Sequence, residues 1–373
     1  MEHFGLLVVV VLCFVGIVSG AGYEGKRPQS QEACYYDDIN KAHFSYERDN
    51  CEGPKNWCRI NRCWTTCGSD RRQSPINIDT YRTMRRYFKN LELKNLYSRV
   101  PAETFNNAFV VPVTGHSPHF EVKEDELSED DNIILTNVPG RPNYKSYVFA
   151  QLHMHVGRED DKGSEHSIND RFYPMEAHMV FYDDEYSDLT HAMSSPDGLV
   201  VIGVMLEVNG RSDDSSECTQ HGECKVRFAK RLSHLMEKYY KKIKEHKPEN
   251  PGNSTDTRPR DLQCGKTPSQ EAISRHCVKK ATHHDDMVSV ECGISPADVL
   301  PRDQRFYTYA GSLTTPPCYE TVQWIVFKCP VRVSKKALKR LQEVEDSHKD
   351  PLKKIGVRRP IQKNRYVEVY RNF

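Results

Sequence analysis

The sequence predicts a mainly β protein of the α+β class, built on one large sheet. Leu199 to Leu206 is a continuous apolar run, which is typical of a strand buried on both faces. Tyr147 to Val156 and Tyr173 to Tyr182 have the length and composition of two further strands. Phe105 to Val122 is rich in β-branched and aromatic residues, and turn residues 114–118 interrupt it, so we expect two strands or one kinked strand there. Many short strands with few helices between them favour a sheet-based fold.

The remaining regular elements follow from the same patterns. Regular structure should begin at Gln73–Ile78, and residues 306–333 should return to strands. Lys225 to Lys247 is the clearest helix, because its apolar residues fall on one stripe at helical spacing. We interpret its Lys- and Arg-rich face as the solvated side of a packed helix rather than a membrane- or mineral-binding surface. A shorter helix is expected over Ser334–Glu345.

Length, charge and the first residues limit the class of protein. The chain has 373 residues and a formal net charge of +1, which gives no reason to expect a nucleic-acid partner. Residues 1–20 are predicted to be a signal peptide, because the apolar run Leu6–Val18 is too short to span a bilayer and small residues follow it. No later stretch has membrane-spanning length, so we expect a secreted, unanchored protein. Residues 21–42 should be an N-terminal extension, followed by the main domain over residues 43–372.

Cysteine usage agrees with an oxidising compartment. The chain has thirteen cysteines, and removal of Cys13 with the signal peptide leaves an even number, which indicates disulfides. The sequence leaves their connectivity open. A metal site at Cys58, Cys63 and Cys67 is the alternative, but their spacing matches no common zinc motif. The remaining cysteines are Cys34, Cys51, Cys58, Cys63, Cys67, Cys218, Cys224, Cys264, Cys277, Cys292, Cys318 and Cys329.

Two polar segments need separate interpretations. Residues 247–292 are predicted to be a polar, cysteine-containing insert, and Asn253 begins a candidate N-glycosylation sequon within it. His283–Asp286 in the same insert offers metal-binding side chains, although a solvated loop explains it as well. Glu121–Asp131 is strongly acidic, and calcium binding is an alternative to a solvated run, but no ordered ligand spacing supports it.

Histidines in two of the predicted strands indicate a metal centre. Side chains alternate between the faces of a strand, so Gln151, His153 and His155 share one face, as do Glu176 and His178. If the strands are neighbours, three imidazoles converge. Three neutral imidazoles leave a tetrahedral zinc one open position, which is the pattern of a catalytic site. The Gln and Glu side chains would then accept hydrogen bonds from ring N–H groups. Two ordinary strand histidines are the alternative for the first pair alone.

Six motifs standing in one order resemble those of the α-class carbonic anhydrases. The resemblance implies a ten-stranded, mostly antiparallel, twisted sheet with peripheral helices. It also implies reversible hydration of carbon dioxide to bicarbonate and a proton, with one zinc ion as cofactor. Zinc lowers the pKa of bound water from 15.7 to about 7, for which carbonic anhydrase is itself the standard example, and the resulting zinc-bound hydroxide attacks carbon dioxide. The motifs are Gln73–Ile78, Gln151–His155, Gly163–His166, Glu176–His178, Gly311–Pro317 and Arg359–Pro360.

The same resemblance implies roles for individual side chains. Three histidines match the zinc ligands (His153, His155 and His178), and Gln151 and Glu176 match the partners that orient them. Thr314 matches the hydroxyl beside the metal, Glu165 the carboxylate that holds this hydroxyl, and His116 the proton shuttle. The other matches are Tyr46 in the water chain, Thr315 beside Thr314, Val180, Val201, Leu313, Val322 and Trp324 in the apolar wall for carbon dioxide, and the disulfide pair Cys67 and Cys318.

Within this class, the chain is most similar to the carbonic anhydrases of molluscan shell matrix. Two departures stand out. The Gly-Asn-rich acidic repeat of those proteins is replaced near residues 209–222 by a short acidic-polar link, so a calcium role for the repeat does not carry over. Thr114 and His119 stand where the class usually has Asn. The matching segments are Phe44–Tyr46, Cys51–Pro54, Cys63, Cys67, Pro174–His178 and Arg358–Asn364.

We therefore expect a secreted zinc carbonic anhydrase of the extracellular shell matrix, acting where calcium carbonate forms. Carbon dioxide and bicarbonate are the expected substrates, and calcium carbonate mineral or matrix proteins are the further partners. Neither a nucleic-acid nor a membrane partner is expected, and a homo-oligomer is compatible with the sequence. The alternative is a non-catalytic mineral- or matrix-binding scaffold, but all three zinc-ligand histidines are present. A metalloprotease is not supported, because the chain has no His-Glu-x-x-His motif.

Overall fold

The computed structural model describes residues 42–48, 50–98, 100–106, 118–208, 288–289, 294–333, 335–344 and 351–373. The central strands are long and the marginal ones short. The helices are α1 (Trp57–Ile60), α2 (Leu189–Ser194), α6 (Lys335–Gln342) and α7 (Leu352–Ile355), with the 3-10 helices η2 (Arg62–Gly68), η3 (Glu124–Glu126), η4 (Glu129–Asp131) and η5 (Pro296–Asp298). The strands are β1 (Asn77–Ile78), β2 (Met84–Arg85), β3 (Glu92–Lys94), β4 (Ala102–Asn106), β5 (Pro118–Val122), β6 (Ile134–Thr136), β7 (Tyr147–Val156), β8 (Ser167–Ile168), β9 (Met175–Asp183), β10 (Leu199–Val208), β11 (Val288–Ser289), β12 (Phe306–Gly311), β13 (Val322–Phe327), β14 (Val331–Val333) and β15 (Tyr370–Arg371).

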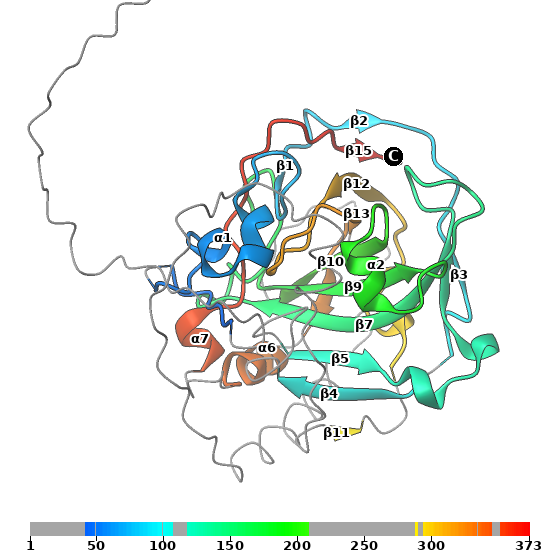
Figure 1. Cartoon of the computed structure of the whole chain (residues 1–373), viewed down its shortest axis with the longest axis horizontal. Helices are drawn as coiled ribbons and strands as arrows, with labels where there is room; N and C mark the ends of the chain where they lie inside the picture. The colour runs from blue at the N-terminus through cyan, green and yellow to red at the C-terminus, as the bar shows by residue number, and fades with distance from the viewer. Residues whose placement is uncertain are drawn as a thin grey trace, which may run out of the picture. The chain divides into compact units, whose positions relative to one another are not determined.

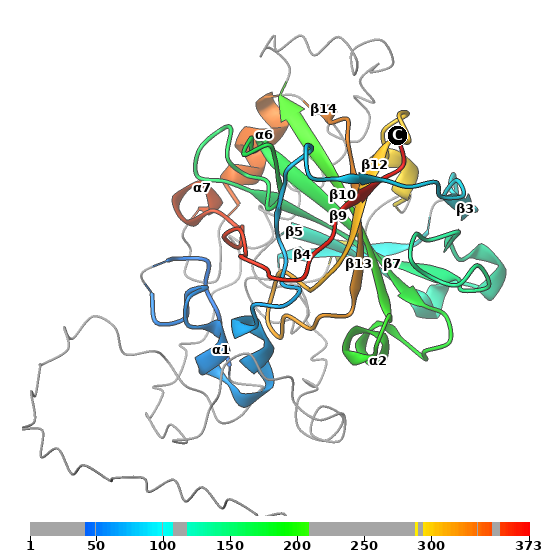
Figure 2. The same cartoon turned by 90° about the horizontal axis from the view of Figure 1, so that it is seen from above.

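In the described part of the chain, 13 strands form one mixed sheet. Its main path runs β11-β4-β5-β7-β9-β10-β13-β12-β15-β2, and β3, β6 and β14 join beside it. Most neighbours are antiparallel, but β10 is parallel to β13 and β14, and β15 is parallel to β2. Figures 1 and 2 show the strands rotating progressively across the sheet, as the right-handed strand twist requires. The predicted mainly β fold with few helices is confirmed.

Side-chain alternation divides the buried apolar residues into two layers, one on each face of the sheet. On β10, Val200, Ile202 and Val204 belong to the first layer, and Leu199 and Val201 belong to the second. The first layer also contains side chains of α1, α6 and α7, and the second contains side chains of α2. The continuous apolar run of this strand is thereby explained, since both of its faces are covered.

A β-bulge in β7 decides which layer receives the polar side chains. Tyr147 and Phe149 belong to the first layer, and strict alternation would send the odd-numbered Gln151, His153 and His155 to the same side. The register with β9 shifts between Phe149 and Gln151. Beyond the shift, the even-numbered apolar residues of β7 occupy the first layer. The odd-numbered polar residues therefore face the second layer, as expected where a bulge re-aims a strand beside a functional site.

The described strands lie close to their predicted bounds. β7 has the predicted ends, and β9 begins and ends within two residues of the predicted ones. The region 105–122 contains the end of β4 and all of β5, which pair antiparallel, so two strands occur rather than one kinked strand. α6 lies within the predicted helix 334–345.

Several predictions fall outside the described residues. They concern the signal peptide 1–20, the extension up to residue 41, the helix 225–247, His116, and the 247–292 insert apart from residues 288–289, including Asn253 and His283–Asp286. Within the described ranges, no helix has the length and apolar character needed to cross a bilayer. The acidic run 121–131 includes η3 and η4, and none of its residues belongs to a metal-ligand cluster of described residues.

Candidate metal centre

β7 and β9 bring three histidines together on the second layer. In their antiparallel register, His153 lies opposite His178, and His155 lies opposite Glu176. The imidazole centroids are 5.2 Å apart for His153 and His155, 5.1 Å for His153 and His178, and 4.5 Å for His155 and His178. All three rings are buried, and their ligand nitrogens lie within 4.8 Å of one another. Such a group can hold a metal ion.

One ring nitrogen of each histidine has an oxygen partner. His153 Nδ1 lies 3.0 Å from Gln151 Oε1, and His155 Nδ1 lies 2.7 Å from the carbonyl oxygen of Val357. His178 Nε2 lies 2.9 Å from a carboxylate oxygen of Glu176. Each of these oxygens can only accept a hydrogen bond, so the ring nitrogen beside it carries the proton and donates. A neutral imidazole that donates through one nitrogen presents a lone pair on the other.

The other three ring nitrogens fit a divalent metal ion. His155 Nε2 is buried and has no hydrogen-bond partner among the described residues, and His178 Nδ1 and His153 Nε2 lie 3.2 Å apart. Buried polar atoms without partners are rare, and facing lone pairs repel unless a cation lies between them. Burial lowers the pKa of the His155 imidazole, although the nearby carboxylate of Glu165 opposes this. The neutral ring is the form that binds zinc, and three imidazoles form a suitable donor set.

Glu176 holds His178 through a fully used carboxylate. Its Oε1 accepts from His178 Nε2 and from His166 Nδ1 at 2.7 Å, and its Oε2 accepts from the backbone N–H groups of Glu165 and His166 at 2.9 Å and 2.8 Å. Burial raises the pKa of this carboxyl, but the charges and hydrogen bonds of the two histidines outweigh it and lower the pKa well below the ordinary value. The side chain is therefore a carboxylate at neutral pH.

A hydrogen-bonded chain connects this carboxylate to the segment that carries Thr314. His166 Nε2 lies 2.6 Å from the Tyr309 hydroxyl, which lies 2.9 Å from Ser74 Oγ. The Ser312 N–H donates to Ser74 Oγ at 3.0 Å, and the Ser74 N–H donates to Ser312 Oγ at 2.9 Å. Residues far apart in the sequence are thus positioned around one buried polar network.

Arg359 ties this network to the N-terminal part of the main domain. Its guanidinium is buried and donates to Gln73 Oε1, to the carbonyl oxygen of Ser74 and to that of Cys67 at 2.8–2.9 Å. Its backbone N–H donates to Glu165 Oε1 at 2.7 Å. Burial lowers the pKa of Arg359 to about 10, so the group remains a cation at neutral pH. Such a buried cation needs these acceptors to offset its desolvation.

Comparison with known proteins identifies the family. The family model described as eukaryotic-type carbonic anhydrase matches residues 52–247 and 262–373. The chain belongs to the carbonic anhydrase family. A nacrein-like protein of Mytilus californianus is 52% identical over 86% of this chain and 99% of its own length. Nacrein-like protein F of Pinctada fucata is 30% identical over 89% of this chain and 92% of its own length. The N66 matrix protein of Pinctada maxima is 35% identical over 55% of this chain and 35% of its own length.

This membership confirms the resemblance stated from the motifs and makes the chain a carbonic anhydrase, for which carbon dioxide and bicarbonate are the substrates. The narrower match to proteins named nacrein is also confirmed. The family match pauses at residues 248–261, within the range of the predicted insert.

The predicted apolar wall lies in the second layer, beside the histidines. The ring of Trp324 is centred 4.8 Å from that of His178. In the strand registers, Val201 lies opposite Val180 on one side and opposite Trp324 on the other. The five predicted wall residues are all buried in this layer: Val180, Val201, Leu313, Val322 and Trp324.

The two predicted threonines and Glu165 are all buried. Thr314 and Thr315 are 5% and 4% exposed. Glu165 Oε2 is buried, receives no hydrogen bond from a described residue, and lies 3.4 Å from His155 Nε2. Tyr46 is buried, and burial followed by the charge of Glu165 raises its pKa well above the ordinary value.

A disulfide between Cys67 and Cys318 joins η2 to the segment that follows Thr315. Cys318 also lies in a hydrogen-bonded turn, in which its backbone N–H donates to the carbonyl oxygen of Thr315 at 2.8 Å. Its own carbonyl oxygen accepts from Gln73 Nε2 at 3.1 Å. The threonine segment is therefore held at both ends, by Ser312 and by the disulfide. The sequence resemblance had implied this cysteine pair.

Sequence reasoning assigned no role to five groups that the structure places around the histidines. Ser74, His166 and Arg359 lie inside recognised motifs, which was the available signal for them. Tyr309 lies two residues before one of the motifs. The carbonyl oxygen of Val357 has no signal in sequence, because every residue carries one. His119 is on β5, where its backbone pairs with His153, and its side chain is not described.

Proposed function

We propose that this carbonic anhydrase is a secreted zinc enzyme that interconverts carbon dioxide and bicarbonate where calcium carbonate is deposited in a shell matrix. The observation that carries the proposal is the convergence of three buried imidazoles, each with an oxygen partner on its other nitrogen. His153, His155 and His178 would hold one zinc ion, which supplies a Lewis acid that lowers the pKa of a water toward neutrality, as known for this family.

The surrounding residues supply the remaining chemistry. The apolar wall accepts an uncharged substrate and offers it no polar competitor for the metal. Thr314 is proposed to donate its hydroxyl proton to Glu165 Oε2, which receives no other hydrogen bond from a described residue. A threonine whose proton is committed in this way can only accept from a group at the metal, and it thereby orients that group. Gln151 and Glu176 keep the ligand rings in the tautomer that faces the metal.

A proton must leave after each hydration step. We propose His116 as the shuttle and Tyr46 as part of the water chain, as the family resemblance implies. An imidazole with an ordinary pKa near 6.5 takes and releases a proton at neutral pH.

The place of action rests on the relatives and on the first residues. Relatives are named nacrein-like, and one is named a matrix protein. The same proposal includes a signal peptide at residues 1–20, an extension at 21–42, a main domain at 43–372 and glycosylation at Asn253. It also includes a further calcium site, calcium carbonate mineral or matrix proteins as partners, and self-association.

The experiment is zinc content and carbon dioxide hydration of the full-length wild type, His153→Ala and His191→Ala. His191 is an exposed histidine on α2 and serves as the matched control. We expect about one zinc ion per chain and hydration activity in the wild type and in the control, and loss of both in His153→Ala. Activity that survives in His153→Ala without zinc would rule the proposal out.

The non-catalytic scaffold is tested with the same proteins in a calcium carbonate precipitation assay. If catalysis supplies bicarbonate for mineral growth, wild type and His191→Ala should change precipitation in the same way, and His153→Ala should not. An equal effect of all three proteins would favour the scaffold.

A further inference from the structure

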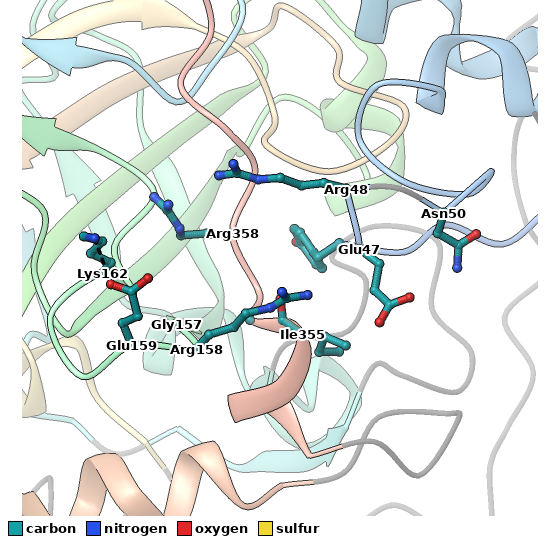
Figure 3. Close-up of a pocket in the computed structure, with 11 residues that line it drawn as sticks. Glu47, Arg48, Asn50, Gly157, Arg158, Glu159, Lys162, Ile355 and Arg358 are labelled. Atoms are coloured by element: carbon teal, nitrogen blue, oxygen red, sulfur yellow. Dashed lines mark hydrogen bonds and ion pairs between the residues drawn. The ribbon is translucent and has the colours of Figure 1, made fainter. Parts of the chain in front are cut away.

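A cavity of about 640 Å³ is lined by three segments that lie far apart in the sequence. It lies between the N-terminal segment around residue 48, the connection after β7 and the segment that follows α7, and no histidine of the metal centre lines it. Figure 3 shows its charged side chains, which come from all three segments. We call this space the arginine cavity. Of its lining residues, Tyr46 alone has a role in the proposed chemistry of the metal centre, as part of the water chain.

The charged side chains in the arginine cavity do not balance one another. Arg48, Arg158, Arg358 and Lys162 line it together with Glu47 and Glu159. Lys162 Nζ pairs with Glu159 at 2.8 Å. Among the described residues, none of the three arginines forms an ion pair with a carboxylate, so the lining keeps an excess of positive charge.

Arg48 and Arg358 come from different segments, and the charge of one acts on the other. Figure 3 shows the Arg48 side chain reaching toward the segment that carries Arg358. Burial lowers the pKa of Arg358, and the neighbouring charge of Arg48 lowers it further. The Arg358 guanidinium also lies 4.5 Å from the centre of the Phe172 ring, which holds it in place. A half-buried cation near a second cation is destabilised, and an anion bound beside them would offset this effect.

Arg158 contributes a third, positioned guanidinium. Its Nε donates to the carbonyl oxygen of Ile355 at 2.9 Å, which leaves its terminal nitrogens as donors. Guanidinium groups donate in a planar fork that matches the oxygen spacing of carboxylate, bicarbonate and phosphate groups.

We propose that the arginine cavity binds an oxyanion beside Arg48 and Arg358, with Arg158 as a further donor. The shared ligand chemistry is a group with at least two charged or partly charged oxygens, such as bicarbonate or inorganic phosphate. A metal cation does not fit a lining with excess positive charge, and a halide has only one acceptor atom, so it cannot form the two parallel hydrogen bonds that an oxyanion forms with a guanidinium.

The cavity is connected to the metal centre through the chain itself. Arg358 stands between Val357, whose carbonyl oxygen is the partner of His155, and Arg359, whose N–H donates to Glu165. Gly157 and Arg158 come directly after β7, which carries His153 and His155. An anion at Arg358 would therefore hold the segment that positions two groups of the metal centre.

The test is calorimetric titration of full-length protein with sodium phosphate and, separately, with sodium bicarbonate, at constant ionic strength maintained with sodium chloride. The proteins are wild type, Arg48→Gln, Arg358→Gln and Arg85→Gln. Arg85 lies on edge strand β2, is exposed and does not line the cavity, so it controls for loss of one positive charge. Each titration is repeated in a His153→Ala background, in which anion binding at the metal centre is removed.

We expect saturable binding of at least one of the two anions to wild type. The dissociation constant should rise at least about tenfold in Arg48→Gln and Arg358→Gln, and stay unchanged in Arg85→Gln and in the His153→Ala background. The comparison of the two anions identifies which oxyanion the site prefers. Arg48 is exposed, so its substitution should leave folding intact even if Arg358→Gln does not. No saturable binding of either anion, equal binding in Arg48→Gln, or loss of binding in His153→Ala would each overturn the proposal.

Discussion

Gly203 is small because a carboxylate occupies the space that a side chain would need. It lies on β10 opposite His178, and a Cβ at this position would lie 2.9 Å from Glu176 Oε1. That oxygen is the one that accepts from both His178 and His166. Gly203→Ala should displace the carboxylate and loosen His178. We expect zinc affinity to fall by about 10- to 100-fold, the range seen when partners of metal ligands are removed.

The measurement is a zinc dissociation constant from competition with a chelator. Val204→Ala is the matched control, because its side chain on the same strand faces the first layer. This control should lower thermal stability through a cavity while leaving zinc affinity unchanged. An unchanged zinc constant in Gly203→Ala would show that Glu176 does not orient the ligand.

His116 is the second residue whose role can be isolated. His116→Ala should lower the turnover number for carbon dioxide hydration in weakly buffered solution, while zinc content stays at the wild-type level. General acid–base groups contribute about 10²–10⁴-fold, and water-mediated transfer makes the lower end of that range the expected loss. Added imidazole buffer should restore the rate by carrying the proton. A loss that imidazole does not restore, or one equalled by His191→Ala, would contradict the shuttle role.

Features of the site that depend on neighbouring residues in one strand could be predicted from the sequence, and features that depend on distant segments could not. Gln151, His153 and His155 were assigned to one face from alternation alone, because the rule applies within one strand. The bulge after Phe149 decides which of the two apolar layers this face packs against. No residue pattern between Tyr147 and Val156 predicts the bulge. The three polar residues still share one face, as alternation predicts, because the bulge lies before them and does not change the spacing between them.

Among the elements, the long strands were the most predictable and the short ones the least. β10 is apolar on both faces, so its composition alone predicts a buried strand, whichever strands lie beside it. β1, β2 and β15 have two residues each, and pairing with distant segments defines them rather than any pattern of their own. The same reasoning explains why the carbonyl of Val357 was missed, since its position comes from the chain path after α7.

The segment after β12 depends on one covalent link. The Cys67–Cys318 disulfide closes a loop of 251 residues, and a crosslink of this length removes much chain entropy from the unfolded state. Replacing both cysteines by serine should lower the free energy of unfolding by about 2–5 kcal/mol. The measurement is urea denaturation followed by fluorescence. A loss of less than about 1 kcal/mol would show that this crosslink contributes little to the stability of the folded chain.

Hydration activity should fall in the same variant, because the disulfide and Gln73 hold the turn that follows Thr314. Mass spectrometry of unreduced, alkylated wild type provides the check on the premise. Alkylation of Cys67 and Cys318 without prior reduction would show that the bond does not form in the protein.

At the scale of the whole described unit, early and late parts of the chain meet at the metal centre. Gln73 and Ser74 contact Arg359 through hydrogen bonds, and Arg359 reaches Glu165 through its backbone. Truncation at either end should therefore affect the site and not only the global stability. This long-range closure also explains why the family motifs are spread along the chain, since they supply the groups that meet in this part of the fold.

Buried tyrosines make the folded protein sensitive to alkaline pH. Burial raises the pKa of Tyr147 and of Tyr182 from 10.0 to about 12, with nearby carboxylates adding to the effect for Tyr182. Between pH 10 and 12 the unfolded chain therefore loses protons that the folded chain keeps, so the free energy of unfolding falls as pH rises. The urea midpoint should be lower at pH 11 than at pH 8, and Tyr147→Phe should reduce this difference. Tyr81 is 95% exposed, so Tyr81→Phe should leave the difference unchanged. If both variants show the wild-type pH dependence, groups other than the buried Tyr147 control alkaline unfolding.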